Sequence, residues 1–593
     1  MKRTVHILFV LSLLLPSCLK DVLDKQPLDS ISDAVVWNDQ ALIDAYLTQA
    51  YLQMYILDNE TPNSDWASSD DWNGPFIVNE LSDECTRNWT FGQSAAKTNG
   101  LTIAGGVLDW WEHAYTSIRT LNEFIKRVPG SPVNEGFKKS RVAEARFLRA
   151  FNYFSMVKRY GGVPVITGPQ DINAGYEELY RARDKEQRVY DFILSEIDAI
   201  ANDLPERGAA EYGRPSRGTA LALKCRAALY AASIAQYSTV ELNGITGIPA
   251  SDAGYYQKAY DAAKLIIGSG QYALYNADAD KVVNFKNVFL KKNNPEVIWA
   301  KRHDNIQRNT GGDGWVWDFF QAPKPHAWNA GNQNAPYVEM AEAFEHTDGT
   351  PGTLNRAAVQ QGLWSTEDLW ANKDPRFYAS IYTQNTAWKG GKVDFHNGLL
   401  LPDGTVLSSG SYQNVPAKGI QSVDNSFGTG FGVMKYLDEG KDNMGERATS
   451  GTDWQLFRYA EVLLNYAEAA FELGRNAEAL DAVNQIRDRA GVAALNTIDH
   501  DKIRHERLVE LAFEGHRYWD LRRWRVAVDV LSRTHSGIRY IRDFGTGKYK
   551  LELIDKIDGT TSNPVFYQRN YYLPITTSRT GNNPNLVENP GYK

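Results

Sequence analysis

Apolar residues recur at helical spacing over much of the chain, and Gly- and Pro-containing turns separate the stretches. The helix that ends at Tyr160 is followed by Gly161, Gly162 and Pro164, which favour a left-handed position and then stop the helix. The fold class is therefore mainly α. The pattern predicts helices at 41–57, 108–128, 137–160, 187–204, 219–237, 255–269, 454–473, 477–490 and 501–531.

Small and large apolar residues alternate over 463–486, on both sides of a short turn at Gly474. Small residues in one helix accept bulky residues from its neighbour, which is the packing of a tetratricopeptide helix pair. Looser pairs are predicted at 108–160, 187–237 and 219–269, and their spacing is uneven. We therefore expect a superhelix of helix pairs without a regular repeat.

Two segments, 58–107 and 285–450, are rich in Gly, Asn, Asp, Thr and Trp and show little helical period. They are predicted to form long loops and short strands, and loops of this length are usually functional. The predicted division is an N-terminal helical part at 41–284 with the insertion 58–107, and a second part at 285–593 with the loop-rich region 285–450 and C-terminal helices at 454–531.

The N-terminus has the features of an export signal. Lys2 and Arg3 precede the apolar run 5–15, which is too short to span a membrane and suits a secretory signal. The run ends in Leu-Pro-Ser-Cys at 15–18, which resembles a bacterial lipobox with Cys18 as the acylated residue. Residues 1–17 would be removed and 18–40 would form a tether to the membrane. The alternative is a secreted protein with an incidental cysteine.

Composition narrows the class of protein. The chain has 593 residues, 64 Lys and Arg against 72 Asp and Glu, and a net charge of −8, with basic residues scattered along it. We therefore expect no nucleic-acid partner. The aromatic share of 12% is high and includes 16 Trp and 31 Tyr. An oxidising compartment would permit Cys85 and Cys225 to pair, and the sequence leaves open whether they do.

Four motifs occur in order along the chain. They read EARFLRAFNYF at 144–154 followed by YGGVP at 160–164, RYAEVLL at 458–464, ERLVELAFEGHRYWDLRRW at 506–524, and NPNLVENPGY at 583–592. Together with the lipobox, these motifs resemble the SusD/RagB-like outer-membrane lipoproteins of Gram-negative bacteria.

The resemblance implies a right-handed superhelix of tetratricopeptide-like helix pairs packed against a loop-rich ligand-binding portion. It implies a cell-surface lipoprotein, held to outer-membrane lipid through acylated Cys18, that captures oligosaccharides or, in some members, peptides. It also implies a partner, a SusC-like TonB-dependent barrel transporter. Such proteins are not enzymes, and we expect no cofactor and no metal.

The third motif places Glu506, Glu510 and Glu514 four residues apart, with Arg507, Arg517, Arg522 and Arg523 nearby. Repeated acids could serve general acid–base chemistry. We favour a structural lattice of arginine–carboxylate pairs, because the planar guanidinium suits bidentate bonding. The same interpretation applies to Glu144, Arg146 and Arg149. His505 and His516 lack metal-ligand spacing, which favours structural or surface roles.

A sugar site requires flat aromatic faces beside polar groups that bind hydroxyls. Asp83, Glu84, Arg87, Asn88 and Trp89 combine these groups within a short segment. The segment also resembles the family's stretch after the first helix, where ligand contacts commonly arise. The alternative for Trp89 is an anchor in the core or at an interface.

A second candidate cluster contains Trp315 and Trp317 beside Asp313. In a strand the two rings would share one face and form a two-ring platform, and the alternative is that one of them is buried. Trp328, with Asn329 and Asn332, belongs to the same cluster, and Trp72 is a weaker candidate. Trp110 and Trp111 are expected to be mainly core. The leading hypothesis is non-catalytic binding of an oligosaccharide. Peptide binding and glycoside hydrolysis by a carboxylate pair remain as alternatives.

Overall fold

The computed structural model describes residues 33–54, 77–87, 97, 108–250, 254–307, 310–326, 332–422, 428–557 and 563–592. The α-helices are α2 (Asp33–Val36), α3 (Gln40–Leu52), α4 (Ile77–Glu80), α6 (Trp111–Arg127), α7 (Glu135–Tyr160), α8 (Tyr176–Leu179), α9 (Glu186–Ile200), α10 (Arg217–Tyr237), α11 (Gly254–Gly268), α12 (Lys281–Leu290), α13 (Trp317–Gln321), α14 (Val338–Ala343), α15 (Arg356–Val359), α16 (Thr366–Leu369), α17 (Pro375–Ser380), α18 (Tyr459–Glu472), α19 (Asn476–Ala490), α20 (His500–Glu510), α21 (Arg517–Arg523), α22 (Ala527–Val530) and α23 (Thr577–Asn582).

The strands are short except for one hairpin. They are β1 (Cys85–Arg87), β2 (Val297–Lys301), β3 (Asn334–Pro336), β4 (Leu363–Trp364), β5 (Ile381–Thr383), β6 (Ala387–Trp388), β7 (Gly391–Lys392), β8 (Leu399–Leu400), β9 (Val406–Leu407), β10 (Ser411–Tyr412), β11 (Val415–Pro416), β12 (Phe431–Val433), β13 (Trp454–Arg458), β14 (Gly537–Asp543) and β15 (Tyr549–Ile554).

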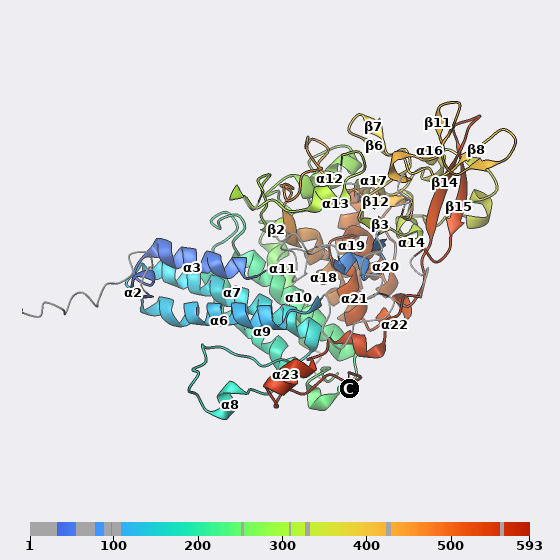
Figure 1. Cartoon of the computed structure of the whole chain (residues 1–593). Helices are drawn as coiled ribbons and strands as arrows, with labels where there is room; N and C mark the ends of the chain where they lie inside the picture. Colours follow the sequence, from blue (N-terminus) through green and yellow to red (C-terminus); the bar gives the residue numbers. More distant parts are fainter. Residues whose placement is uncertain are drawn as a thin grey trace, which may run out of the picture.

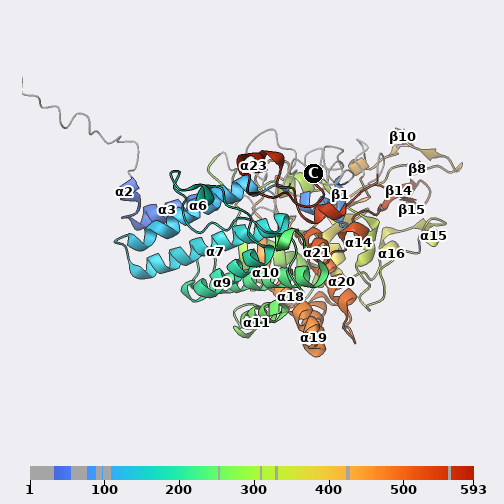
Figure 2. The same ribbon diagram turned by 90° about the horizontal axis from the view of Figure 1, so that it is seen from below.

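The long helices form one continuous stack. Helix α6 packs on α7, α7 on α9, α9 on α10, α10 on α11, α11 on α18 and α18 on α19 (Figures 1 and 2). Helix α10 is buried over most of its length, because its many alanines let neighbouring helices approach closely. The stack is the predicted superhelix of tetratricopeptide-like pairs, and the mainly α fold class is confirmed.

Two predicted helices need correction. The segment 454–473 begins as β13, which pairs antiparallel with β2, and becomes helical only at Tyr459. The segment 501–531 is broken into α20, α21 and α22. The first break follows Glu510, where Phe513 and Gly515 adopt positive φ angles of 62° and 76°. A helix cannot continue through left-handed residues, so the chain turns there.

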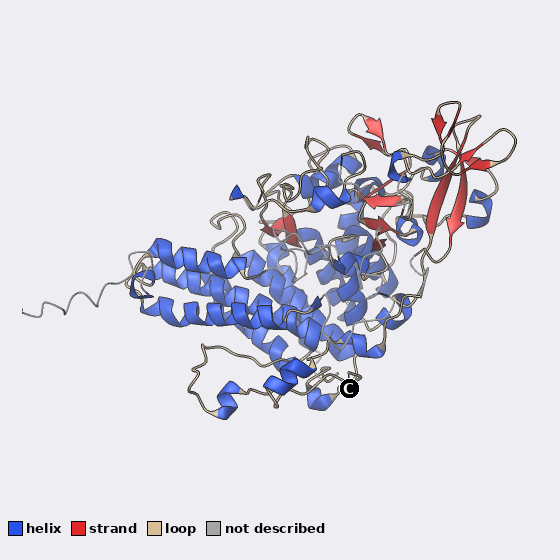
Figure 3. Cartoon of the chain, viewed as in Figure 1, coloured by secondary structure: helices blue, strands red, loops and turns tan. Residues whose placement is uncertain are grey.

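Short strands and short helices occupy the region between the two helical blocks, and most strands lie at one end of the molecule (Figure 3). A five-stranded sheet has the order β4-β15-β14-β8-β9, in which β14 and β8 are parallel. The short strands agree with the sequence prediction. The short helices α13 to α17 were not predicted, because each is only four to six residues long.

An ionic lattice joins α17, β13 and α19 to α20. Glu510 accepts from Arg376 at 2.9 Å and from Arg458 at 2.7 Å, and it also pairs with Arg489. Arg458 reaches Glu514 at 2.6 Å. We call these five buried residues, together with Glu296, Arg487 and Glu506, the ionic lattice.

The lattice confirms the structural interpretation of the three acids, with partners other than those expected. The cations come from Arg376, Arg458, Arg487 and Arg489, with Lys435 as a further partner of Glu514, whereas Arg507 and Arg523 pair with Asp520. In the first motif, Arg146 and Arg149 pair with Glu196, and Glu144 pairs with Arg141 and Arg214.

Cys85 and Cys225 are free, buried thiols. No helix in the described part of the chain is long and apolar enough to cross a bilayer. Cys18 and the predicted signal and most of the tether lie outside the described residues.

Candidate functional site

The first predicted segment forms one side of a small two-stranded ladder. Strand β1 pairs antiparallel with β3, and the Cα atoms of Arg87 and Asn334 face one another. Because the strands are antiparallel, the chain leaves β1 beyond Arg87 at the end of the ladder where it enters β3 through Asn332 and Gln333. Two described chain ends therefore meet at this end of the ladder. One is Arg87, which precedes Asn88 and Trp89, and the other is Asn332, which follows Trp328 and Asn329.

Asp83 and Glu84 hold this ladder in place. Both oxygens of Asp83 accept from Arg517 of α21, at 2.8 and 2.9 Å. Burial would raise the pKa of Asp83, but the Arg517 charge outweighs it and the pKa lies below its usual value. Glu84 accepts from the backbone nitrogen of Phe513 at 2.8 Å and contacts Ser82 at 3.0 Å. Both side chains are thus engaged by the protein.

A buried polar network continues from the ladder. The Asn334 amide donates to Glu80 at 3.1 Å and accepts from Gln321 at 2.7 Å. Burial raises the pKa of Glu80 to about 7, despite the nearby charges of Arg87 and Lys97. With its amide oxygen turned toward β1, Gln333 accepts from the Arg87 guanidinium at 2.6 Å.

Asn332 stands at the open end of this network. Its side chain is 1% exposed, its φ is 63°, and within the described residues neither amide atom has a hydrogen-bond partner. A buried amide without partners is costly, so such a group is most often completed by water or a ligand.

The two-ring platform predicted for Trp315 and Trp317 is not on the surface. Their rings stack at 5.2 Å, but they are only 5% and 0% exposed and pack among His303, Tyr436 and Trp454. The expected strand is absent because Trp317 begins α13, and its Nε1 donates to the carbonyl of Lys435 at 2.9 Å. The rings are core residues here, so no glycan platform can be built on them.

The other named candidates, Trp72, Asn88, Trp89, Trp328 and Asn329, lie outside the described residues. Their role stays a prediction. Trp110 is fully buried and Trp111 is 8% exposed, in line with the expected core role.

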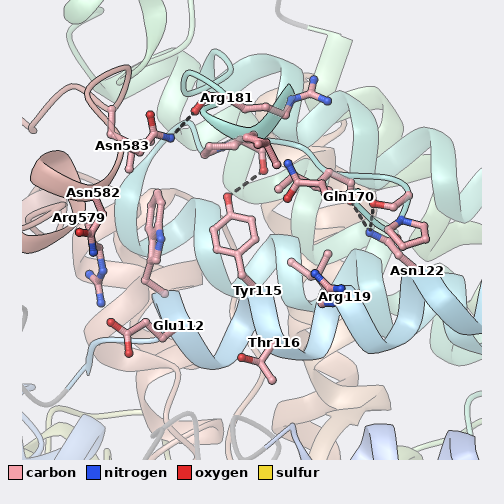
Figure 4. Close-up of a pocket in the computed structure, with 18 residues that line it drawn as sticks. Glu112, Tyr115, Thr116, Arg119, Asn122, Gln170, Arg181, Arg579, Asn582 and Asn583 are labelled. Carbon is pink, nitrogen blue, oxygen red and sulfur yellow. Dashed lines mark hydrogen bonds between the residues drawn. The ribbon is translucent and has the colours of Figure 1, made fainter. Parts of the chain in front are cut away.

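A groove that the sequence did not predict lies along α6 (Figure 4). Its volume is about 510 Å³, and its walls are α6, residues 164–181, and the C-terminal segment 579–586. Trp111, Tyr115 and Arg119 line one wall at four-residue spacing, which places them on one helical face.

Hydrogen bonds fix the groove walls to one another. Tyr115 donates to the carbonyl of Pro164 at 2.8 Å, and Asn122 donates to that of Ile166 at 2.9 Å. Asn583, the first residue of the C-terminal motif, donates to the carbonyl of Arg181 at 3.0 Å. The C-terminal motif therefore closes the groove. The spacing on α6 was a readable signal, but nothing in the sequence linked it to residues more than 450 positions away.

Among the described residues, neither His505 nor His516 lies in a candidate metal site. His505 lies 3.9 Å from Glu345 and His516 is half-buried, where burial holds its pKa well below the usual value. No group of three potential metal ligands occurs in the portion of the chain that the structure describes.

Known protein families match the chain along most of its length. The SusD family model matches residues 295–592, and a model described as starch-binding and associating with the outer membrane matches residues 21–229. A SusD-like protein of Formosa agariphila is 26% identical over 443 residues, which cover 71% of this chain and 73% of that protein.

Two further proteins align over nearly the whole chain. The starch-binding protein SusD of Bacteroides thetaiotaomicron is 24% identical over 98% of this chain and 97% of its own length. The crystal structure of a SusD-like protein from Bacteroides fragilis has a TM-score of 0.72 at 25% identity, covering 96% of this chain and 100% of that one. Since the SusD family model spans half of the 593 residues, the chain belongs to the SusD family.

Proposed function

We propose that this protein is a non-catalytic, cell-surface lipoprotein that binds an oligosaccharide and delivers it to a SusC-like TonB-dependent barrel in the outer membrane. Membership of the SusD family supports the proposal, as do the starch-binding description of one matching family model and the starch-binding name of one relative. The lipobox-like segment ending at Cys18 supports anchoring to outer-membrane lipid.

The observation that carries the binding site is the register of the β1–β3 ladder. Arg87 and Asn332 mark the same end of it. Arg87 is the last described residue before Asn88 and Trp89, and Asn332 is the first described residue after Trp328 and Asn329. Guanidinium and amide groups bind sugar hydroxyls, and Trp89 and Trp328 would supply aromatic faces. Asp83 and Glu84 serve this site by fixing the ladder to α21 and the Phe513 turn.

Isothermal titration of the mature chain against a glycan panel tests the binding. We expect Trp89→Ala with Trp328→Ala, and separately Arg87→Ala, to weaken binding at least tenfold, since each removes a stacking face or a charged donor. Tyr567→Ala is the matched control, because Tyr567 is an aromatic residue 45% exposed and outside the ladder. Unchanged affinity in all the site variants would reject this site, and an exclusively peptidic ligand would reject the glycan.

Anchoring and delivery need a separate experiment. Cys18→Ala should move the chain from the outer-membrane fraction to the soluble fraction, because the acyl chains would be lost. Purification of the lipidated chain from outer membranes should recover a TonB-dependent barrel with it. Recovery of the chain alone under gentle extraction would count against delivery.

A further inference from the structure

The groove along α6 carries an excess of positive charge. Three arginines, Arg119, Arg181 and Arg579, line it, against a single acidic residue, Glu112. The chain as a whole has a net charge of −8, so this local excess is opposite to the overall charge. A cleft lined by one sign of charge attracts ligands of the other sign.

Two of the three guanidinium groups are free to bind. Among the described residues, Arg119 is exposed and Arg181 half-buried, and neither side chain has a hydrogen-bond or ion-pair partner. Arg579 differs, because its Nη2 donates a hydrogen bond to Asp109 at 2.6 Å. Its Cζ atom also lies 5.6 Å from the centroid of the Trp111 ring. Arg579 therefore shapes the end of the groove, while Arg119 and Arg181 offer open charge.

The positions of these groups suit an extended ligand. Figure 4 shows Arg579 and Arg119 toward opposite ends of the α6 wall with Tyr115 between them, and Arg181 on the facing wall. Trp111 and Arg119 are two helical turns apart, which is about 12 Å along α6. A single small anion would not span this distance.

The remaining polar groups favour a sugar over an acidic peptide. Within the described residues, the side-chain oxygen of Gln170, the amide of Asn582 and the hydroxyl of Thr116 line the groove without side-chain partners for those atoms. They provide donors and acceptors for hydroxyls beside the half-buried Tyr115 ring. Strand addition, a common mode of peptide binding, needs an exposed strand edge, whereas in the described chain the groove is bordered by α6, α8, α23 and loops.

We propose that this groove is a second binding site, which takes an acidic oligosaccharide whose carboxylate or sulfate groups bind Arg119 and Arg181. The site uses elements other than the β1–β3 ladder, so it stands independently of the proposed function of the ladder. Guanidinium groups bind both carboxylate and sulfate through paired hydrogen bonds, and the groove chemistry is shared by uronate and sulfated sugars.

Titration of the full mature chain with three probes tests the proposal: a short oligogalacturonate, a short sulfated carrageenan oligosaccharide and a neutral maltooligosaccharide. We expect at least one acidic probe to bind, more weakly as salt rises. The double variant Arg119→Gln, Arg181→Gln should weaken that binding at least tenfold, since each lost bond to a charged group is worth that much. The preferred acidic probe distinguishes carboxylate from sulfate.

Lys126→Gln is the control, because Lys126 is exposed on the same helix as Arg119 and does not line the groove. Its substitution removes one positive charge, as each of the two arginine substitutions does. Its affinity for the acidic probe should be unchanged. Undiminished binding in the arginine double variant, or no binding of either acidic probe, would overturn the proposal. Arg87→Ala should leave acidic binding intact, so a failure of the ladder site and a failure of the groove give different results.

Discussion

Arginine has opposite roles in the ionic lattice and in the groove along α6. Arg458 is 2% exposed and contacts Glu296, Glu510 and Glu514 at 2.6 to 2.7 Å, whereas Arg119 is exposed and has no partner within the described chain. The residue type is the same, and the number of carboxylates within reach decides the role. A guanidinium saturated by the protein is structural, and one left open to solvent is available to a ligand.

The lattice is stable only as a complete set. Taking ions out of water is costly, and the cost is offset only when each charge has several well-placed partners. Burial would raise the pKa of Glu510, but Arg489, Arg458 and Arg376 outweigh burial and hold that pKa well below its usual value. The lattice therefore has no spare cation that a ligand could use.

The largest expected effect comes from breaking the lattice. Glu510→Gln removes one charge from the reach of three buried guanidinium groups, and we expect the free energy of unfolding to fall by about 3–5 kcal/mol. Urea unfolding monitored by circular dichroism measures it. A loss below about 1 kcal/mol would show that the lattice tolerates a missing partner, which contradicts the comparison.

A smaller effect is expected in the aromatic layer beside the lattice. Trp317→Phe keeps a ring but removes the hydrogen bond to the Lys435 carbonyl, leaving a buried acceptor, and should cost about 1–3 kcal/mol of unfolding free energy. Because Trp317 is fully buried, the glycan affinity of the folded variant should match that of the parent protein. If glycan affinity fell while the unfolding free energy did not change, Trp317 would have to contact the ligand.

Glu84 differs from Glu510, because no guanidinium of the described residues forms an ion pair with it and burial raises its pKa to about 7. The pKa of Glu84 in the unfolded chain is about 4.3. Between pH 4.3 and pH 7 the folded state therefore keeps a proton on Glu84 that the unfolded state has lost. This contribution to stability is fully present below pH 4.3 and is lost as the pH rises through 7.

Glu84→Gln keeps the contacts with Ser82 and the Phe513 turn but cannot titrate. Between pH 5 and pH 7 the parent protein should therefore lose about 2 kcal/mol more unfolding free energy than the variant. Unfolding titrations at both pH values measure the difference. Parallel losses in the two proteins would mean that Glu84 is ionised in the folded state at both pH values.

Local patterns in the sequence predicted the helices well, because apolar periodicity and Gly–Pro stops act over a few residues. The local pattern did not predict the helix break after Glu510, because Glu84 fixes the Phe513 turn and lies more than 400 residues away in sequence. Trp315 and Trp317 were misplaced for the same reason. Aromatic density indicates burial or binding equally well, and only the packing of Tyr436 and Trp454 around them decides.

The smallest expected effect lies in the groove, where Glu112 is the one lining carboxylate. Glu112→Gln should change the unfolding free energy by less than about 0.5 kcal/mol. Glu112 is exposed and lacks an ion-pair partner among the described residues, so the variant loses only a weak interaction with the N-terminus of α6. Removing its repulsion should tighten binding of an acidic oligosaccharide about two- to threefold at low salt, and the gain should vanish at high salt. Titrations at two salt concentrations, with a neutral glycan as control, measure this. Weaker acidic binding in the variant would mean that Glu112 itself contacts the ligand, and that charge alone does not govern the groove.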